Sequence, residues 1–114
     1  MDLLNILKII AALATVLTGM FAAFAPRRIQ GFTGLMVDGG RGITEVRSIF
    51  GGLFIAVGLA PLFLQETAAF QMLGFSYLGI AAVRVVSIFV DRSAVQSNWI
   101  SLAVEVVFGV LLIL

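Results

Sequence analysis

Leu3–Ala25 reads LLNILKIIAALATVLTGMFAAFA, and Lys8 is its one charged residue. A run of roughly 20 apolar residues is long enough to cross, as an α-helix, a hydrocarbon core about 30 Å thick. Pro26 follows at once, and a proline together with the cations Arg27 and Arg28 ends such a helix at the membrane surface. This stretch therefore predicts a first transmembrane span.

The rest of the sequence repeats this pattern. We expect spans at about 3–25, 43–64, 68–90 and 99–114. The 114 residues are 61% hydrophobic and 11% charged, whereas soluble domains carry about 25% charged residues. Four spans with short connections use nearly the whole length. The predicted fold is therefore all-α: a single membrane domain over residues 1–114, built as an antiparallel bundle of four transmembrane helices.

Charge and residue types exclude several classes of function. The formal net charge is +1, which gives no reason to expect nucleic acid as a partner. The sequence has no Cys and no His, which removes thiolate nucleophiles, disulfides, imidazole ligands and His-dependent triads. We therefore expect no cofactor and no metal site, and we expect membrane lipids around the chain.

Cations are distributed unequally between the two ends of the predicted bundle. Antiparallel spans place both termini on one face and the connections 26–42 and 91–98 on the other. The terminal face carries Lys8. The connection face carries four arginines, Arg27, Arg28, Arg41 and Arg92. Because cytoplasmic loops hold an excess of Lys and Arg, we expect a bacterial inner-membrane protein with both termini in the periplasm.

Four ionisable residues lie inside the second, third and fourth predicted spans: Glu45, Arg47, Arg84 and Glu105. At 1.5 Å per residue, all four lie within roughly 10 Å of the connection face and so form one layer. Charges inside a membrane are usually paired. We predict an Arg84–Glu105 pair, with Glu45, and Tyr77 or Ser87, in the same network.

This charged layer has three possible roles. We favour a structural ion-pair network that sets the register of the helices. The alternatives are a site for a ligand, substrate or proton, and an interface with another protein. Arg47 lies close enough to the surface to extend its charge to the headgroups.

Small residues at four-residue spacing predict faces on which helices pack closely, because they let backbones approach. Such stripes occur in three spans: Ala11, Thr15, Gly19 and Ala23; Ser48, Gly52, Ala56 and Ala60; and Ser101, Glu105 and Gly109. They predict close packing of the first, second and fourth spans. Glu45 precedes the second stripe by three residues, so we expect its carboxylate to point into the bundle.

Gly39–Gly40–Arg41–Gly42 is expected to belong to the longest connection, and it lacks the GxxxxGK[ST] pattern of a nucleotide-binding loop. Arg41 and the free N–H groups at the start of the second span are a candidate site for a lipid phosphate. The alternative is a flexible turn. Apolar residues earlier in this connection predict that part of it lies along the membrane surface or folds back into the bundle: Ile29, Phe32, Leu35 and Met36.

The sequence GRGITEVR from Gly40 to Arg47 is followed by Gly51–Gly52–Leu53, an arginine in the third span and a glutamate in the fourth. This pattern resembles the small bacterial four-helix membrane proteins of the family called domain of unknown function 4345. The resemblance covers nearly the whole chain and implies the fold and the membrane location, but no activity. The layout is also distantly similar to that of DoxX-like four-span proteins, some of which look like membrane subunits of quinone-linked oxidoreductases.

Three functional hypotheses follow. We favour a non-catalytic membrane protein, either a structural or accessory subunit of a membrane complex or a self-associating bundle, whose partners are further copies or other membrane-protein subunits. The alternative is a binder or transporter of a small amphipathic molecule, a lipid or a quinone, with the charged layer as the polar end of its pocket. An enzyme with Glu45 or Glu105 as general base is the third, and no second catalytic group at a recognisable spacing supports it.

Overall fold

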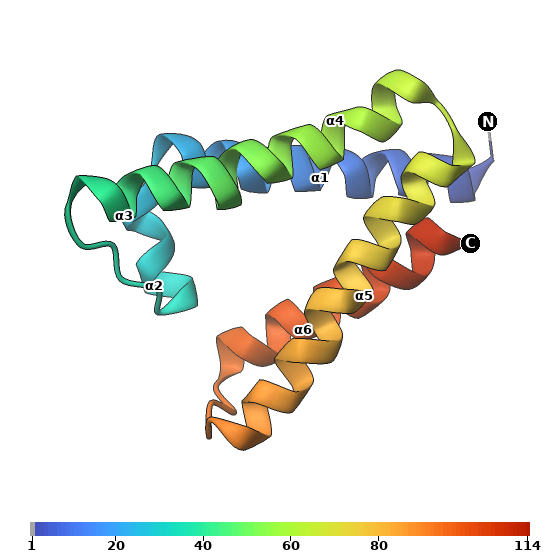
Figure 1. Ribbon diagram of the computed structural model, residues 1–114. Helices are drawn as coiled ribbons and strands as arrows, with labels where there is room; N and C mark the ends of the chain where they lie inside the picture. The colour runs from blue at the N-terminus through green and yellow to red at the C-terminus, as the bar shows by residue number, and fades with distance from the viewer. Residues whose placement is uncertain (1) are drawn as a thin grey trace. The chain divides into compact units, whose positions relative to one another are not determined.

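The computed structural model describes residues 2–114, and this range contains helices and no strand. The elements are α1 (Leu3–Phe24), η1 (Pro26–Ile29), α2 (Gln30–Thr33), α3 (Gly39–Glu45), η2 (Val46–Leu53), α4 (Phe54–Leu64), α5 (Thr67–Val90) and α6 (Gln96–Ile113), as Figure 1 shows. The elements α3, η2 and α4 follow one another without a break. They form one long helix whose middle segment, η2, is a π-helix.

Four helices are long and apolar enough to cross a membrane: Leu3–Phe24, Gly39–Leu64, Thr67–Val90 and Gln96–Ile113. The shortest has 18 residues, which at 1.5 Å per residue is about 27 Å. Large apolar side chains remain exposed along these helices, Phe63 at 80% and Phe89 at 68% among them. Such surfaces suit lipid rather than water. The predicted all-α fold with four spans is confirmed, and the chain is a multi-pass membrane protein.

The chain divides into two compact units, which we describe separately. The α1–α4 unit comprises Ala12–Leu64. The α5–α6 unit comprises Gln65–Leu114 together with the chain up to Ala11. Helix α1 is therefore shared: its residues up to Ala11 belong to the α5–α6 unit, and its residues from Ala12 belong to the α1–α4 unit.

In the α1–α4 unit, α1 packs against the long second helix through glycines. A Cβ atom added to Gly19 would lie 2.7 Å from the carbonyl oxygen of Gly51, and one added to Gly51 would lie 2.8 Å from the Cβ of Ala23. A Cβ on Gly58 would lie 2.9 Å from the carbonyl oxygen of Ala12. The two backbones are therefore in direct contact, which is how helices associate where lipid provides no hydrophobic drive.

The second span uses a different packing face from the one predicted. All four residues of its predicted stripe, Ser48, Gly52, Ala56 and Ala60, are exposed, whereas Gly51 and Gly58 are buried. The predicted stripe passes through Gly52, which lies one residue, or about 100° around the helix, from Gly51. The buried glycines Gly51 and Gly58 lie seven residues, or two turns, apart, as on one face of a regular α-helix. In the π-helix, backbone hydrogen bonds join residues i and i+5, and the buried residue Val46 lies five positions before Gly51.

Several boundaries also differ from the prediction. The second span begins at Gly39 rather than near residue 43, so the glycine-rich stretch is the first turn of α3 and not part of the connection. This span ends at Leu64, as predicted, and Pro61 is buried within α4. The fourth span begins at Gln96 rather than at residue 99. The connection between the first and second spans folds into η1 and α2. Helix α2 is followed by its C-cap residue Gly34, whose φ of 75° is a conformation that favours glycine.

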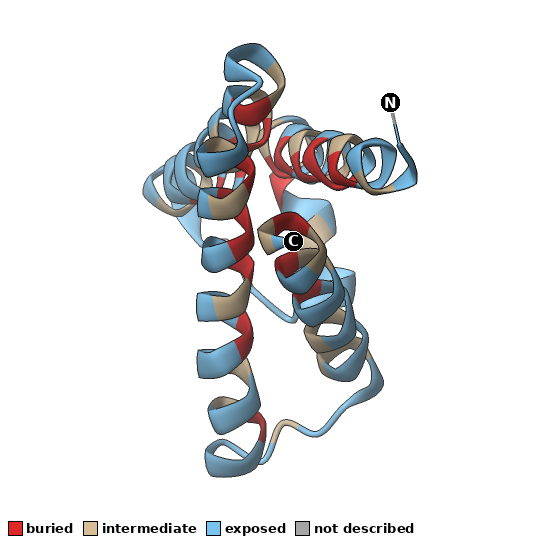
Figure 2. Ribbon diagram, turned by 90° about the vertical axis from the view of Figure 1, so that its right-hand side faces the viewer, coloured by how far each residue is buried: buried red, intermediate tan, exposed pale blue. Residues whose placement is uncertain are grey.

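In the α5–α6 unit, two antiparallel helices pack through a second pair of glycines. A Cβ on Gly74 would lie 2.9 Å from the carbonyl oxygen of Gly109. Beside this contact, the rings of Tyr77 and Phe108 meet edge to face with centroids 5.6 Å apart. Figure 2 shows the buried positions on the sides of α5 and α6 that face each other. The fourth-span stripe therefore packs against the third span, which the stripe prediction had left out.

Candidate functional site

An ion pair joins α5 to α6 near the connection between them. Arg84 donates from Nε to Oε1 of Glu105 at 2.8 Å and from Nη2 to Oε2 of the same carboxylate at 2.7 Å. The guanidinium and carboxylate thus meet in a two-point arrangement, the strong geometry for this pair of groups. The structure contains the Arg84–Glu105 pair that the equal depths of the two residues predicted.

Asn98 is a third member of this cluster, and the sequence analysis missed it. Its Oδ1 accepts from Nη1 of Arg84 at 2.8 Å, while its Nδ2 donates to the carbonyl oxygen of Ser93 at 2.9 Å. The spacing in the sequence could have indicated it, because Asn98 precedes Glu105 by seven residues, or two helical turns. The two residues share one face of the helix, since α6 begins at Gln96 and includes both. Asn98 thereby ties the connection to the ion pair.

Burial and hydrogen bonding together indicate what this cluster does. The side chain of Glu105 is 9% exposed and that of Arg84 is 30% exposed. All three guanidinium nitrogens of Arg84 have an acceptor. A buried charge pair joined by these hydrogen bonds fixes the geometry of the two helices, and it leaves Arg84 only the second N–H group of each Nη atom.

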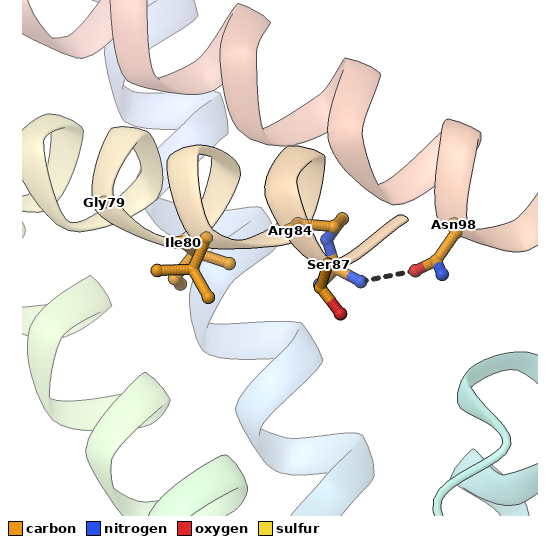
Figure 3. Close-up of a pocket in the computed structure, with 6 residues that line it drawn as sticks. Gly79, Ile80, Arg84, Ser87 and Asn98 are labelled. Carbon is orange, nitrogen blue, oxygen red and sulfur yellow. Dashed lines mark hydrogen bonds between the residues drawn. The ribbon is translucent and has the colours of Figure 1, made fainter. Parts of the chain in front are cut away.

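A cavity of about 500 Å³ adjoins the cluster, lined by Gly79, Ile80, Val83, Arg84, Ser87 and Asn98. Figure 3 shows Arg84 bonded to Asn98 at this cavity. The prediction added Glu45, and Tyr77 or Ser87, to the network of the pair. The hydroxyl of Ser87 donates instead to Asp91, the C-cap residue of α5.

Glu45 has a different partner from the one predicted. Its carboxylate forms an ion pair with Arg41, four residues earlier on the same helix, and its side chain is 54% exposed. The expectation that it points into the bundle is wrong for two reasons. Residues Gly39–Gly42 are helical, which brings Arg41 one turn before Glu45. Glu45 also shares the exposed face of Ser48 that the π-helix turns away from α1.

Arg47 stabilises the end of another helix. Its Nη1 donates to the carbonyl oxygen of Ala23 at 2.9 Å. The last four carbonyl groups of a helix have no N–H donor within that helix, and Ala23 lies in the last turn of α1. Arg47 therefore caps α1 from the second span. Arg41 remains a candidate contact for a lipid phosphate only in competition with Glu45.

A second cavity, of about 510 Å³, lies within the α1–α4 unit and was not predicted as a site. The connection folds back to form one wall, as its apolar residues suggested. The lining residues come from α1, η1, α2, η2 and α4: Leu17, Thr18, Phe21, Ala22, Arg28, Ile29, Phe32, Thr33, Phe50 and Phe54. Two of its rings, Phe50 and Phe54, are tilted against each other with centroids 6.5 Å apart.

Arg28 is the one charged residue among the described residues that line this cavity. The side chain of its neighbour Arg27 donates to the carbonyl oxygen of Val37, whereas the guanidinium of Arg28 makes no hydrogen bond or ion pair with any residue of the described range 2–114. The hydroxyl of Thr18 donates to the carbonyl oxygen of Ala14 in α1, and that of Thr33 donates to the carbonyl oxygen of Ile29 in η1. The cavity thus has aromatic and aliphatic walls and one available cationic donor.

A family model for domain of unknown function 4345 matches residues 3–114. The chain belongs to this family. The matched range includes all four spans, the Arg84–Glu105 pair and both cavities. No curated protein and no solved structure matches the chain.

The described residues of this domain of unknown function 4345 protein contain no group of three or more His, Cys, Asp or Glu side chains that could hold a metal ion. Two arrangements of side chains are candidates for a binding site. One is the Arg84–Glu105–Asn98 cluster, whose polar groups bind one another. The other is the apolar cavity, where Arg28 is available to an oxygen acceptor.

Proposed function

We propose that the chain is a non-catalytic membrane domain that binds a small amphipathic molecule, a lipid or a quinone, in the cavity of the α1–α4 unit. The observation that carries this proposal is the combination of apolar walls and one cationic donor in a cavity of about 510 Å³. Ligand pockets of roughly 300–1,000 Å³ with apolar walls and few polar groups are typical of small-molecule sites.

Arg28 supports this function through its chemistry. A guanidinium has five N–H donors in a planar fork, which suits phosphate or carbonyl oxygens. The chain of the ligand lies against Phe21, Phe32, Phe50 and Phe54 in this proposal, while its oxygen atoms accept from Arg28. The polar end of the pocket is thus Arg28 and not the layer of four charges. The Arg84–Glu105 pair instead holds α5 to α6.

The location is part of the proposal. Arginines gather in the connections, with Arg27 and Arg28 in η1 and Arg92 between α5 and α6. By the positive-inside rule, they support an inner-membrane protein of bacteria whose connections face the cytoplasm and whose termini face the periplasm.

Native mass spectrometry of the protein, gently extracted from its own membranes, tests this function. The wild type is expected to retain one lipid or quinone, identified by its mass. Arg28→Gln is expected to reduce the retained fraction about tenfold, since a hydrogen bond to a charged group contributes roughly 1.5–3 kcal/mol. Arg92→Gln, which removes an exposed cation from the other unit, is the matched control. Equal retention by wild type and Arg28→Gln would refute the site.

A second candidate function, accessory subunit or self-associating bundle, is favoured by the exposed stripe of the second span. Ser48, Gly52, Ala56 and Ala60 lie on a face that α1 does not cover. Small residues on an exposed helix face allow another helix to approach closely. In the same spectra, a dimer or a co-purified subunit that disappears in Gly52→Leu would support this function. A ligand-bearing monomer would support the first.

A further inference from the structure

Lys8 is buried in the α5–α6 unit, and its side chain has no partner among the described residues. It is 7% exposed, although lysine is almost never fully buried unless it is paired. The side chain of Lys8 makes no hydrogen bond and no ion pair within the described residues, 2–114. No fully buried side-chain nitrogen in this range lacks a partner, so the Lys8 ammonium keeps some exposed surface although the residue as a whole is buried. An ammonium held among buried residues without an acceptor is unfavourable, so its surroundings indicate what it is positioned to meet.

Lys8 lines a cavity of about 260 Å³, which Asn5, Ile9, Gln65, Thr67 and Phe70 complete. All of these residues belong to the α5–α6 unit. Lys8 is the only charged residue among the described residues that line the cavity. The walls also carry the amide groups of Asn5 and Gln65 and the hydroxyl of Thr67.

The start of α5 adds a second source of positive potential to this cavity. Helix α5 has 24 residues and begins at Thr67, and its N-cap residue, Glu66, makes no side-chain capping bond. The first N–H groups of a helix have no acceptor within the helix, and its aligned dipoles give that end a positive partial charge. An anion beside Thr67 would be attracted by this end and by the Lys8 ammonium together.

We infer that this cavity binds a phosphate group, with the Lys8 ammonium and the N-terminus of α5 as its donors. The cavity lies at the level of the headgroups, because Lys8 is about 8 Å along α1 from Leu3 and Thr67 begins its own span. The acidic residues nearby do not occupy it: Asp2 accepts from the backbone N–H of Asn5, and neither Asp2 nor Glu66 lines the cavity. Both a phospholipid headgroup and free phosphate have the required chemistry.

Two binding measurements on the full-length chain test the inference and identify the source of the phosphate. Inorganic phosphate is titrated calorimetrically into delipidated protein in a non-ionic detergent. Phosphatidylglycerol retention is measured by native mass spectrometry after reconstitution in mixed phosphatidylglycerol and phosphatidylcholine nanodiscs. Binding in both measurements indicates that phosphate alone is sufficient, and binding in the nanodisc measurement only indicates a lipid headgroup.

Lys8→Gln is expected to weaken binding at least about tenfold in whichever measurement detects it, since it removes a charge-assisted donor. Lys8→Arg should restore most of the binding, and Arg92→Gln should change it less than about twofold, because Arg92 is an exposed cation outside the cavity. The inference is overturned if the wild type binds neither probe, or if Lys8→Gln and Arg92→Gln weaken binding equally.

Thr67→Asp provides a second variant that does not remove Lys8. A carboxylate in the first turn of α5 stabilises the helix and supplies Lys8 with an internal anion. We expect this variant to fold and to lose phosphate binding at least about tenfold. Unchanged binding by a folded Thr67→Asp protein overturns the inference. The site shares no lining residue with the cavity beside Arg28, so either proposal can fail while the other stands.

Discussion

Arg84→Met is expected to lower the free energy of unfolding by about 3–5 kcal/mol, because it leaves the charge of Glu105 buried without its partner. The Glu105 carboxylate is 9% exposed and receives all of its charge-assisted hydrogen bonds in the described structure from Arg84. Methionine keeps much of the apolar volume of the arginine stem, so the loss reports on charge and hydrogen bonding rather than on packing.

The measurement is detergent-induced unfolding followed by the fluorescence of Trp99, the one tryptophan of the chain. Its ring lies against Phe89 of α5 with centroids 6.2 Å apart, so its emission reports separation of the two helices. Arg92→Met is the control, with an expected change below about 0.5 kcal/mol. The double variant Arg84→Met/Glu105→Leu should regain most of the stability, since an apolar replacement of the whole pair leaves no uncompensated charge. A stable, unaltered Arg84→Met protein would contradict a structural role and return the pair to consideration as a ligand site.

Gly51→Ala is expected to destabilise the protein by about 1–3 kcal/mol, whereas Gly52→Ala is expected to leave it unchanged or slightly more stable. The added Cβ at Gly51 would lie 2.8 Å from the Cβ of Ala23, too close without a shift of α1. The same atom at Gly52 would have only the carbonyl oxygen of Arg47 within 4 Å, at 3.9 Å. Two neighbouring glycines in one span thus provide an internally matched pair.

Unfolding of both variants under the same detergent conditions decides the register of the second span. The reverse order, with Gly52→Ala the more harmful, would mean that the span packs as a regular α-helix along the predicted stripe. Equal stabilities would mean that α1 and the second span are not in backbone contact at this position.

The membrane fold could be predicted because it depends on quantities that the sequence contains directly. The length of an apolar run and the cations at its end define a span without knowledge of its neighbours. The Arg84–Glu105 pair could also be predicted, since both helices are regular and a residue count converts to depth at a constant rise. Asn98 was missed because the start of α6 was placed three residues too late.

The errors on the second span follow from the choice of its packing face. The prediction placed that face at Gly52, with Glu45 on it, whereas the buried face passes through Gly51, about 100° away around the helix. The π-helix Val46–Leu53 was missed as well, because nothing in the local composition marks such a segment. The cavities beside Arg28 and Lys8 were not predictable for another reason: each is formed by segments distant in sequence, and only the fold brings their walls together.

The additional residue of the π-helix rotates the part of the span that precedes it relative to the part that follows. One residue more than a regular helix needs changes the direction of every side chain before it, relative to α4, by about 100°, which is the turn per residue of an α-helix. That single additional residue therefore determines the direction in which the Arg41–Glu45 pair faces around the helix axis. Deletion of one amino acid within Val46–Leu53 would therefore rotate the charged N-terminal end of the span toward a new neighbour, while α4 kept its orientation.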